Sequence, residues 1–320
     1  MNNTKYTYAV ARIRANETGL LTDTDYDMLI NASDKESVIR ILNDKGWNIN
    51  AKHIYKSLED ELSKVWDLIS ESVPDITLLN SLITENDFFN LKAALKANFS
   101  NLPIDNYYIK PCTFDTTALT YAVTHNEFKD IPEHIRYTAK KAYNSYAENS
   151  SGQDSEIIID RACLETCVSF SEKSGSELLK KIMIIKCVQA NIKTAKRCLL
   201  RGKTVDFTKE ALAVCPGIDN DELIETVNDD DKLIQFISKT PFSYMKNAVT
   251  ESFTEFENFC YDYSVNLTKA SKWDIDGPDP VVSYWIIKSN EIRNARVILS
   301  AKANDLTVEN LRKRVRGINV

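Results

Sequence analysis

The chain has 320 residues, of which 43% are hydrophobic and 27% charged, and its net charge is −6. This composition is typical of a soluble globular protein, and the acidic balance argues against a nucleic-acid-binding protein, which normally carries a basic field. The chain contains eight glycines and eight prolines, so glycine-rich phosphate loops and tight hairpins are disfavoured and long helices are favoured.

The N-terminal segment Tyr8–Ile30 reads YAVARIRANETGLLTDTDYDMLI. It lacks the apolar core of a secretory signal, and acidic residues such as Glu17 and Asp23 argue against a mitochondrial presequence. The longest run without Asp, Glu, Lys or Arg is Thr116–Asn126, eleven residues, whereas a membrane-spanning helix needs roughly 20. We therefore expect the opening segment to be part of the fold, and no signal peptide or transmembrane span.

Apolar residues recur every three or four positions along most of the chain, which predicts helices. These stripes are Ile54–Ile69, Phe88–Phe99, Ile135–Tyr146, Leu178–Leu199 and Met245–Leu267. Turn-forming residues predict breaks at Asn101–Pro111, Asn149–Asp154, Cys215–Asn220 and Asp274–Pro280. No run shows convincing β alternation, so the sequence predicts an all-α fold.

Three segments share the pattern polar residue, Leu or Ile, Lys or Arg, any residue, Ala. They are NLKAALK from Asn90, NIKTAKR from Asn191 and EIRNARV from Glu291, spaced 101 and 100 residues apart. A longer predicted helix precedes each segment, at Ile54–Val73, Ser155–Ser171 and Ser243–Lys269. Self-similarity at an even spacing indicates related units, and we predict three helical modules at residues 1–105, 106–205 and 206–320.

The regions before these helices also match one another. MLINASDKESVIRIL from Met28 and LIETVNDDDKLIQFI from Leu223 agree in their apolar positions and in Asp34 and Asp229, whereas the middle copy at Thr116–Phe128 is much weaker. The N-terminal ARI and LTDTDYDML resemble the C-terminal ARV and LTVENL. Matching ends predict a closed, ring-like arrangement of the modules.

The segment RGKT at Arg201–Thr204 invites comparison with a phosphate-binding loop. That loop needs a glycine five positions before Gly202, but position 197 is Arg, and a predicted helix precedes the segment in place of a strand. We expect Gly202 to end that helix, because glycine adopts positive φ at little cost.

Cys163 and Cys167, four residues apart on a predicted helix, could supply two metal ligands. No C-x₂-C pair accompanies them and the three histidines have no metal-site spacing, so small buried residues are the better interpretation. Seven cysteines in such a chain suggest reduced thiols. The clusters Asp229–Asp231 and Asp274/Asp276/Asp279 occur at turns, where Asp satisfies local backbone donors. We expect no catalytic residue, metal or cofactor site.

The opening segment, the threefold repetition, the scarcity of glycine and the C-terminal LRKRVRG together resemble the C subunits of the bacterial and archaeal V/A-type ATPases, a family homologous to the d subunit of the eukaryotic vacuolar ATPase. The resemblance covers essentially the whole chain. It implies a funnel of three similar helical domains with pseudo-threefold symmetry, on the cytoplasmic face of the membrane. The weak middle copy puts the equivalence of the three walls in doubt.

The resemblance implies a non-catalytic rotor component that binds no nucleotide. In that family the funnel lies on the membrane-embedded proteolipid ring, receives the shaft built from the D and F subunits, and transmits torque. The resemblance leaves open whether the assembly moves H⁺ or Na⁺, and whether the assembly makes or hydrolyses ATP.

Five basic residues are candidates for partner contacts, three of them at the same position of the repeated pattern: Lys92, Lys193, Arg293, Arg12 and Arg296. Solvated surface charge is the alternative interpretation of these residues. For the chain as a whole, the alternatives are a free-standing helical-repeat scaffold, whose repeats normally span roughly 20–45 residues, and an all-α enzyme with an unrecognised site.

Overall fold

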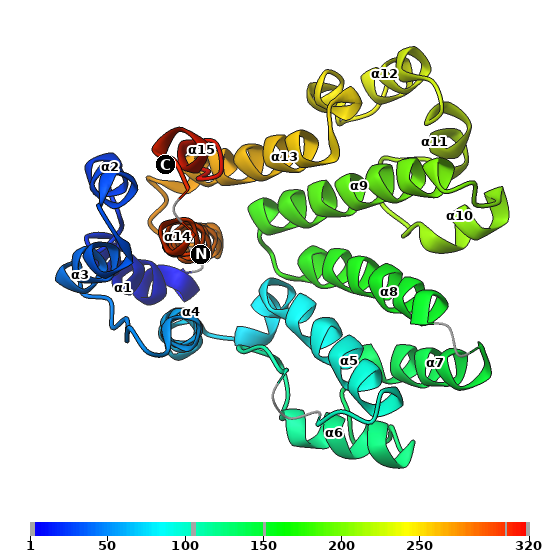
Figure 1. Cartoon of the computed structure of the whole chain (residues 1–320), viewed down its shortest axis with the longest axis horizontal. Coiled ribbons are helices and arrows are strands. Elements are labelled where there is room, and N and C mark those ends of the chain that lie inside the picture. Colours follow the sequence, from blue (N-terminus) through cyan, green and yellow to red (C-terminus); the bar gives the residue numbers. More distant parts are fainter. Residues whose placement is uncertain (1–3, 104–106, 150–151, 305, 318–320) are drawn as a thin grey trace. The chain divides into compact units, whose positions relative to one another are not determined.

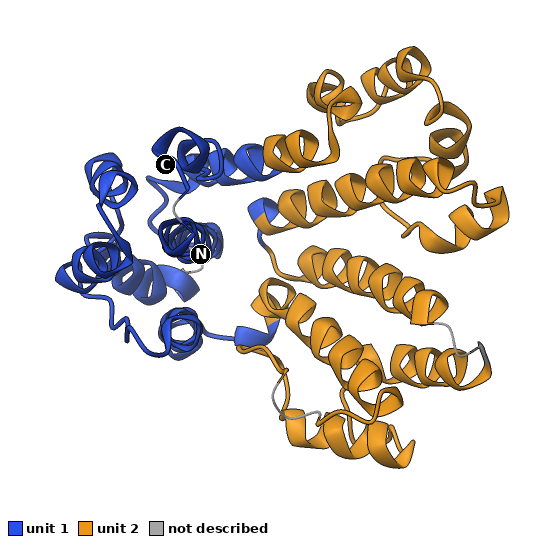
Figure 2. Ribbon diagram, viewed as in Figure 1, with its two compact units in different colours: residues 1–77, 176–178, 261–320 blue, residues 78–175, 179–260 orange. Residues whose placement is uncertain are grey.

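The computed structural model describes residues 4–103, 107–149, 152–304 and 306–317. Over these ranges every regular element is a helix and no strand is present, which confirms the all-α prediction. The chain divides into two compact units, coloured separately in Figure 2: unit 1 is residues 1–77, 176–178 and 261–320, and unit 2 is residues 78–175 and 179–260. The division into three modules remains a prediction.

Unit 1 joins the two ends of the chain in one core. α14 packs against α1, α3 and α4 (Figure 1), and Leu29, Leu42, Leu58 and Ile298 are fully buried there. Its elements are η1 (Thr4–Tyr6), α1 (Thr7–Glu17), α2 (Asp23–Asn31), α3 (Lys35–Asp44), α4 (Ile54–Ser72), the second half of α13 (Phe253–Leu267), η5 (Thr268–Ser271), α14 (Asp279–Ala303) and α15 (Val308–Arg312). The opening segment is therefore part of the fold, as predicted.

Unit 2 contains a second core, in which α5 packs against α6, α7 and α8. Leu91, Leu95, Leu119 and Ile135 are fully buried in it. The remaining elements are η2 (Ile76–Leu82), α5 (Thr84–Phe99), α6 (Thr116–His125), α7 (Glu133–Asn149), α8 (Gly152–Lys173), α9 (Glu177–Leu200), α10 (Val205–Ala211), α11 (Asn220–Thr226), α12 (Asp230–Ser238), η3 (Ser243–Met245), η4 (Ala248–Thr250) and the first half of α13. The first residues of η2 and α9 belong to unit 1.

The helix predicted from Ser243 begins later, at Phe253, so that prediction is wrong at its N-terminus. Two short 3₁₀ turns, η3 and η4, occupy the preceding residues. Ser252 and Glu255 form a reciprocal capping pair, because each backbone N–H donates to the other's side-chain oxygen at 3.3 Å. This pair fixes the helix start. The predicted break at Asn149–Asp154 is also too long, since α8 begins at Gly152; residues 150–151 lie outside the described residues.

The matched aspartates of the short helix pairs have the same role. Asp34 caps α3 by accepting from the backbone N–H of Ser37 at 2.7 Å, and Asp229 caps α12 by accepting from Lys232 at 3.1 Å. In the middle copy, the 17-residue α7 stands where the other two copies have a short second helix. This difference explains why the sequence match is weak there.

The three helices that carry the repeated pattern, α5, α9 and α14, are called the signature helices below. Each holds a later backbone segment through one fully buried asparagine, which both donates to and accepts from a single residue. Asn90 bonds Ile109 at 3.0 and 2.7 Å. Asn191 bonds Ala213 at 2.7 and 3.0 Å, and Asn294 bonds Arg316 at 2.7 and 3.2 Å. We call these three residues the clamp asparagines.

The signature helices also end in the same way. Each closes with a backbone bond to a carbonyl that lies seven residues after the clamp asparagine: Leu102 to Ala97, Lys203 to Cys198 and Leu306 to Ala301, at 2.8, 3.0 and 3.0 Å. Asn101 and Gly202, which precede the first two donors, have φ of 53° and 62°, as this type of helix ending requires. The expectation that Gly202 ends a helix is confirmed.

These bonds correct the alignment of the third copy by three residues. Asn294, and not Glu291, is equivalent to Asn90 and Asn191, so Arg296 rather than Arg293 is equivalent to Lys92 and Lys193. The sequence pattern selected Glu291 because it required Ala at the fifth position. In the third copy that position is occupied by Ile298, which is as fully buried as Ala94.

Candidate functional site

Two of the five candidate basic residues lie in ion pairs within unit 2. Lys92 on α5 bonds Asp160 on α8 at 2.5 Å. Lys193 on α9 pairs with Glu257 on α13. Both side chains are largely buried, with exposed fractions of 23% and 17%. At these two equivalent positions the positive charge connects a signature helix to the long helix of the following repeat.

The other three candidates lie in unit 1, and over the described part of the chain none of them forms an ion pair as short as those of Lys92 and Lys193. Arg12 contacts Glu71 at 3.3 Å. The guanidinium of Arg293 lies 4.2 Å from the ring centre of Tyr261. Arg296 is exposed on α14, and no described residue forms an ion pair with it. The five candidates are therefore divided between the two units, with two in unit 2 and three in unit 1.

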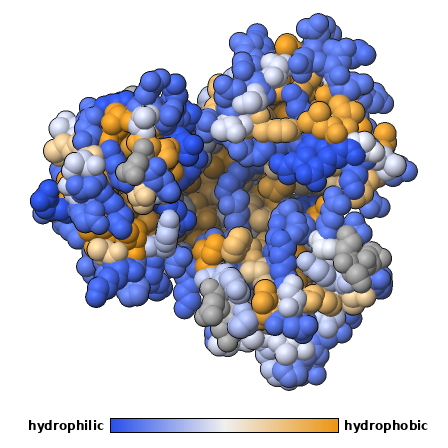
Figure 3. All heavy atoms as spheres, viewed as in Figure 1, coloured by the Kyte–Doolittle hydropathy of each residue, from blue (hydrophilic) through white to orange (hydrophobic). Residues whose placement is uncertain are grey.

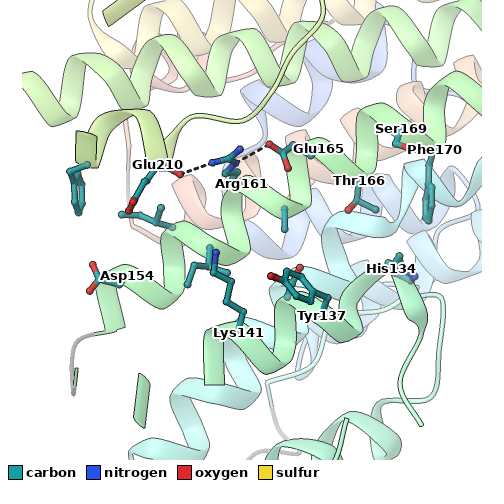
Figure 4. A pocket seen from close by; sticks show the side chains of 15 residues that line it. His134, Tyr137, Lys141, Asp154, Arg161, Glu165, Thr166, Ser169, Phe170 and Glu210 are labelled. Carbon is teal, nitrogen blue, oxygen red and sulfur yellow. Dashed lines mark hydrogen bonds and ion pairs between the residues drawn. The ribbon is translucent and has the colours of Figure 1, made fainter. Parts of the chain in front are cut away.

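A groove of unit 2 lies along α7, α8 and α10 and has a volume of about 860 Å³. Figure 4 shows Tyr137 and Lys141 on α7, opposite Arg161 and Glu165 on α8. Tyr137 is 77% exposed. The groove is open along its length, so it has the form of a surface contact and differs from the enclosed, mostly apolar cavities that bind small molecules.

Arg161, Glu165 and Glu210 of this groove bond to one another. Arg161 donates to Glu165 at 2.9 Å and, more weakly, to the carbonyl of Glu210 at 3.4 Å. Glu165 also accepts from the backbone N–H of Val214 at 2.9 Å. These bonds connect α8 to the segment around α10, so Arg161 and Glu165 stabilise the fold of unit 2.

His134, at one end of the groove, bonds a buried carboxylate. Its Nε2 lies 2.9 Å from Oδ2 of Asp87, which is fully buried. The same carboxylate accepts from the hydroxyl and the backbone N–H of Thr113 at 2.7 and 2.9 Å. Asp87 therefore joins α5, the segment before α6 and the start of α7, and sequence reasoning missed this connection because its partners are 26 or more residues away.

Unit 1 contains a second cavity, of about 480 Å³. Its lining includes Glu291, which accepts from the backbone N–H of Leu21 at 2.5 Å and from Lys288 at 2.6 Å. Burial raises the pKa of Glu291, although Lys288 and Leu21 oppose this effect. The carboxylate thereby connects α14 to the segment that precedes α2. The sequence analysis did not predict this contact, because it treated Glu291 only as the first residue of the third repeated segment.

Two predicted turn aspartates bind distant groups and not local ones, which corrects that prediction. Asp276 accepts from the backbone N–H of Tyr6 at 2.8 Å, at the start of α1. Asp279 accepts from the hydroxyl of Ser176 at 2.5 Å. Both carboxylates therefore stabilise the packing of unit 1.

The cysteines are free thiols. Cys167 is buried and Cys163 is half-buried, and a hydrogen bond with Cys167, together with burial, raises the pKa of the Cys163 thiol. Within the described ranges, no three His, Cys, Asp or Glu side chains are grouped closely enough to hold a metal ion. Over the same ranges, no helix combines the length and the apolar character needed to cross a bilayer.

Comparison with known proteins gives a consistent result. Residues 9–314 match the family model described as ATP synthase (C/AC39) subunit. The chain is 23% identical over 320 residues to the C subunit of the V-type sodium ATPase of Enterococcus hirae, a match that covers 96% of both proteins. It is 21% identical over 325 residues to the C subunit of the A-type ATP synthase of Thermococcus kodakarensis, which covers 96% of this chain and 89% of the relative.

Proposed function

Because residues 9–314 match its model, the chain belongs to the ATP synthase (C/AC39) subunit family, and on that premise we propose that it is a non-catalytic rotor component of a V/A-type ATPase. In this role it links the shaft built from the D and F subunits to the proteolipid ring and transmits torque between them. It is peripheral to the membrane, on the cytoplasmic face, and its three modules form a pseudo-threefold funnel.

The observation that carries this proposal is the length of the family match, which leaves few residues outside it. The clamp asparagines support it physically. A torque-transmitting body must resist deformation, and each clamp ties a signature helix to a backbone segment about 20 residues further on through two buried bonds. A helix tied to a neighbouring segment by hydrogen bonds resists displacement better than one held only by apolar packing, because hydrogen bonds are directional.

The five basic residues remain our proposed partner contacts, with Arg296 first among them. It is exposed and unpaired within the described residues, so an acidic surface of the shaft or ring can bind it without breaking an internal bond. Charge complementarity of this kind fixes orientation and accelerates association. Lys92 and Lys193 would have to leave Asp160 and Glu257 to do the same.

The test is a pull-down of the tagged chain from detergent-solubilised membranes of cells that contain the whole complex. The proteolipid and the D and F subunits should be recovered with it. Arg296→Glu should reduce that recovery severalfold, because reversal of a contact charge introduces repulsion. Arg40→Glu, at an exposed arginine of α3 outside the candidate set, is the matched control. Recovery of the chain free of all three partners would refute the proposal.

A second expectation concerns nucleotides. The purified chain should neither hydrolyse ATP nor bind it in isothermal calorimetry, because position 197 is Arg where a phosphate-binding loop needs glycine and because Gly202 ends a helix instead of cradling phosphate. Stoichiometric binding at micromolar concentration would contradict the non-catalytic assignment.

A further inference from the structure

The two most exposed large apolar side chains of the described residues are close neighbours in one loop of unit 1. Trp273 is 84% exposed and Ile275 is 82% exposed. The loop follows η5 and precedes α14. Apolar side chains reach the surface elsewhere as well (Figure 3), but a tryptophan and an isoleucine this exposed and this close together are a candidate contact surface.

Hydrogen bonds from the N-terminal segment hold this loop in place. Arg14 on α1 donates to the carbonyls of Ser271 and Asp274 at 2.8 and 3.3 Å. Asp276 accepts from the backbone N–H of Tyr6 at 2.8 Å and from the hydroxyl of Thr7 at 3.3 Å. The residues on both sides of Ile275 are therefore bonded to the N-terminal segment of η1 and α1, which holds the loop that carries the two apolar side chains.

Cationic groups surround the same loop. The 480 Å³ cavity of unit 1 is lined by Arg14, Lys269 and Lys272, and the loop continues directly from Lys272. Lys269 and Lys272 are exposed, and neither forms an ion pair among the described residues. The nitrogen of Lys272 lies 5.8 Å from the ring centre of Trp273.

The acidic groups nearby are mostly engaged. Glu17 and Glu291 line the cavity, but Glu17 pairs with Arg14 at 2.7 Å and Glu291 pairs with Lys288 at 2.6 Å. On the loop itself, Asp276 accepts hydrogen bonds from Tyr6 and Thr7, which leaves Asp274 as the exposed carboxylate of the loop. The mouth of the cavity therefore offers two ammonium groups, unpaired within the described residues, beside an exposed tryptophan and isoleucine.

We propose that this part of unit 1 binds an anionic phospholipid surface. Trp273 and Ile275 enter the headgroup–acyl boundary, and Lys269 and Lys272 bind headgroup phosphates at the mouth of the cavity. Tryptophan and lysine together are characteristic of membrane interfaces, where the ring is amphipathic and the ammonium group neutralises anionic lipid. The contact requires only this chain, so it can be tested without the other components of the complex and does not depend on the rotor assignment.

The experiment is flotation of the purified full-length chain with vesicles of mixed phosphatidylcholine and phosphatidylglycerol, against vesicles of pure phosphatidylcholine. Binding should require the anionic lipid and should weaken with salt. Of the four tryptophans, Trp273 is the exposed one, since Trp47 and Trp285 are buried and Trp66 is partly covered by Trp285. The tryptophan emission should therefore shift to shorter wavelength when vesicles are added.

Two double variants test which side chains make the contact. Trp273→Ser with Ile275→Ser should weaken vesicle binding at least about tenfold, because burial of even one large apolar side chain supplies that factor. Lys269→Gln with Lys272→Gln should weaken it about as much on anionic vesicles. The control, Leu200→Ser with Val214→Ser, removes two side chains of unit 2 that are 75% and 67% exposed and should leave binding unchanged.

Circular dichroism should show that all three double variants are folded, since every altered side chain is exposed. The proposal is overturned if the chain does not float with anionic vesicles, or if the loop variants bind as well as the wild type. It is also overturned if the loop variants keep vesicle binding but lose the protein partners in the pull-down, because the loop would then be a protein contact.

Discussion

Each clamp asparagine uses both bonding groups of its carboxamide on one backbone residue. A neutral carboxamide supplies one donor and one acceptor side by side, which matches the two bonding groups of a peptide unit. Asn90, Asn191 and Asn294 use both groups while fully buried. Aspartate would lose the donor and bury a charge, and leucine would leave the backbone groups of the held segment without partners.

Asn90→Ala and Asn191→Ala should therefore each lower the free energy of unfolding by about 2–4 kcal/mol, since two bonds are lost and two buried backbone groups remain unsatisfied. Urea denaturation followed by circular dichroism measures the change. Asn228→Ala, at an exposed asparagine of unit 2, serves as the control and should stay within about 0.5 kcal/mol of the wild type. Equal losses in all three variants would mean that the clamps add nothing specific.

Glu291 predicts a pH dependence of stability. Its pKa is raised above the usual 4.5, chiefly by burial, so the folded protein retains a proton that the unfolded chain releases. The stabilisation that comes from this proton is complete below pH 4.5 and is lost as the pH rises through the folded pKa. Glu291→Gln cannot ionise, so the variant should gain stability relative to the wild type as the pH increases over that range. Parallel pH profiles of the two proteins in urea denaturation would contradict the assignment.

At the scale of the helices, spacing in the sequence predicted most of what the structure contains. The helices at Ile54–Ser72, Thr84–Phe99 and Glu177–Leu200 follow directly from apolar stripes. Boundaries were predicted less well, because they depend on side-chain caps. The start of α13 is fixed by Ser252 and Glu255, a pair that is visible in the sequence but that the continuous apolar stripe obscured.

The register of the third repeat could not be found from the pattern alone. The true match requires that Ile298 replace Ala94, and a pattern of residue types does not show that both are buried in equivalent places. The hydrogen bonds of the candidate site also could not be predicted from the sequence. Lys92–Asp160 and Glu291–Leu21 join residues 68 and 270 positions apart, and nothing local marks either partner.

The shared ending of the signature helices allows a comparison between two equivalent positions. Gly202 and Asn101 both have positive φ, and asparagine adopts that conformation at lower cost than other residues with a Cβ. Gly202→Asn should therefore be nearly neutral, whereas Gly202→Ala should cost about 1–2 kcal/mol. Space is not the cause, since a Cβ at Gly202 would meet nothing within 4 Å. Thermal unfolding of the two variants side by side tests this, and an alanine variant as stable as the asparagine one would disprove it.

At the scale of the molecule, unit 1 is assembled from both ends of the chain. Glu291 bonds Leu21, Asn294 lies 3.4 Å from the hydroxyl of Tyr26, and α14 fills the core between α1, α3 and α4. The same packing explains the division into two units, in which unit 1 takes residues 1–77 together with residues 261–320. The apolar faces of α2–α4 are covered by residues that lie much later in the sequence and are therefore synthesised later.

That arrangement imposes an order on biosynthesis. A ribosome makes roughly 5–20 residues per second, so α2–α4 leave the exit tunnel roughly 10–50 s before α14 follows them. During that interval Leu29, Leu42 and Leu58, all fully buried in the finished protein, have no α14 to cover them. The nascent chain consequently presents a large apolar surface while unit 2 is still being translated. Chaperones that bind exposed apolar segments should be found on ribosomes stalled before residue 279 and should be released once α14 has emerged.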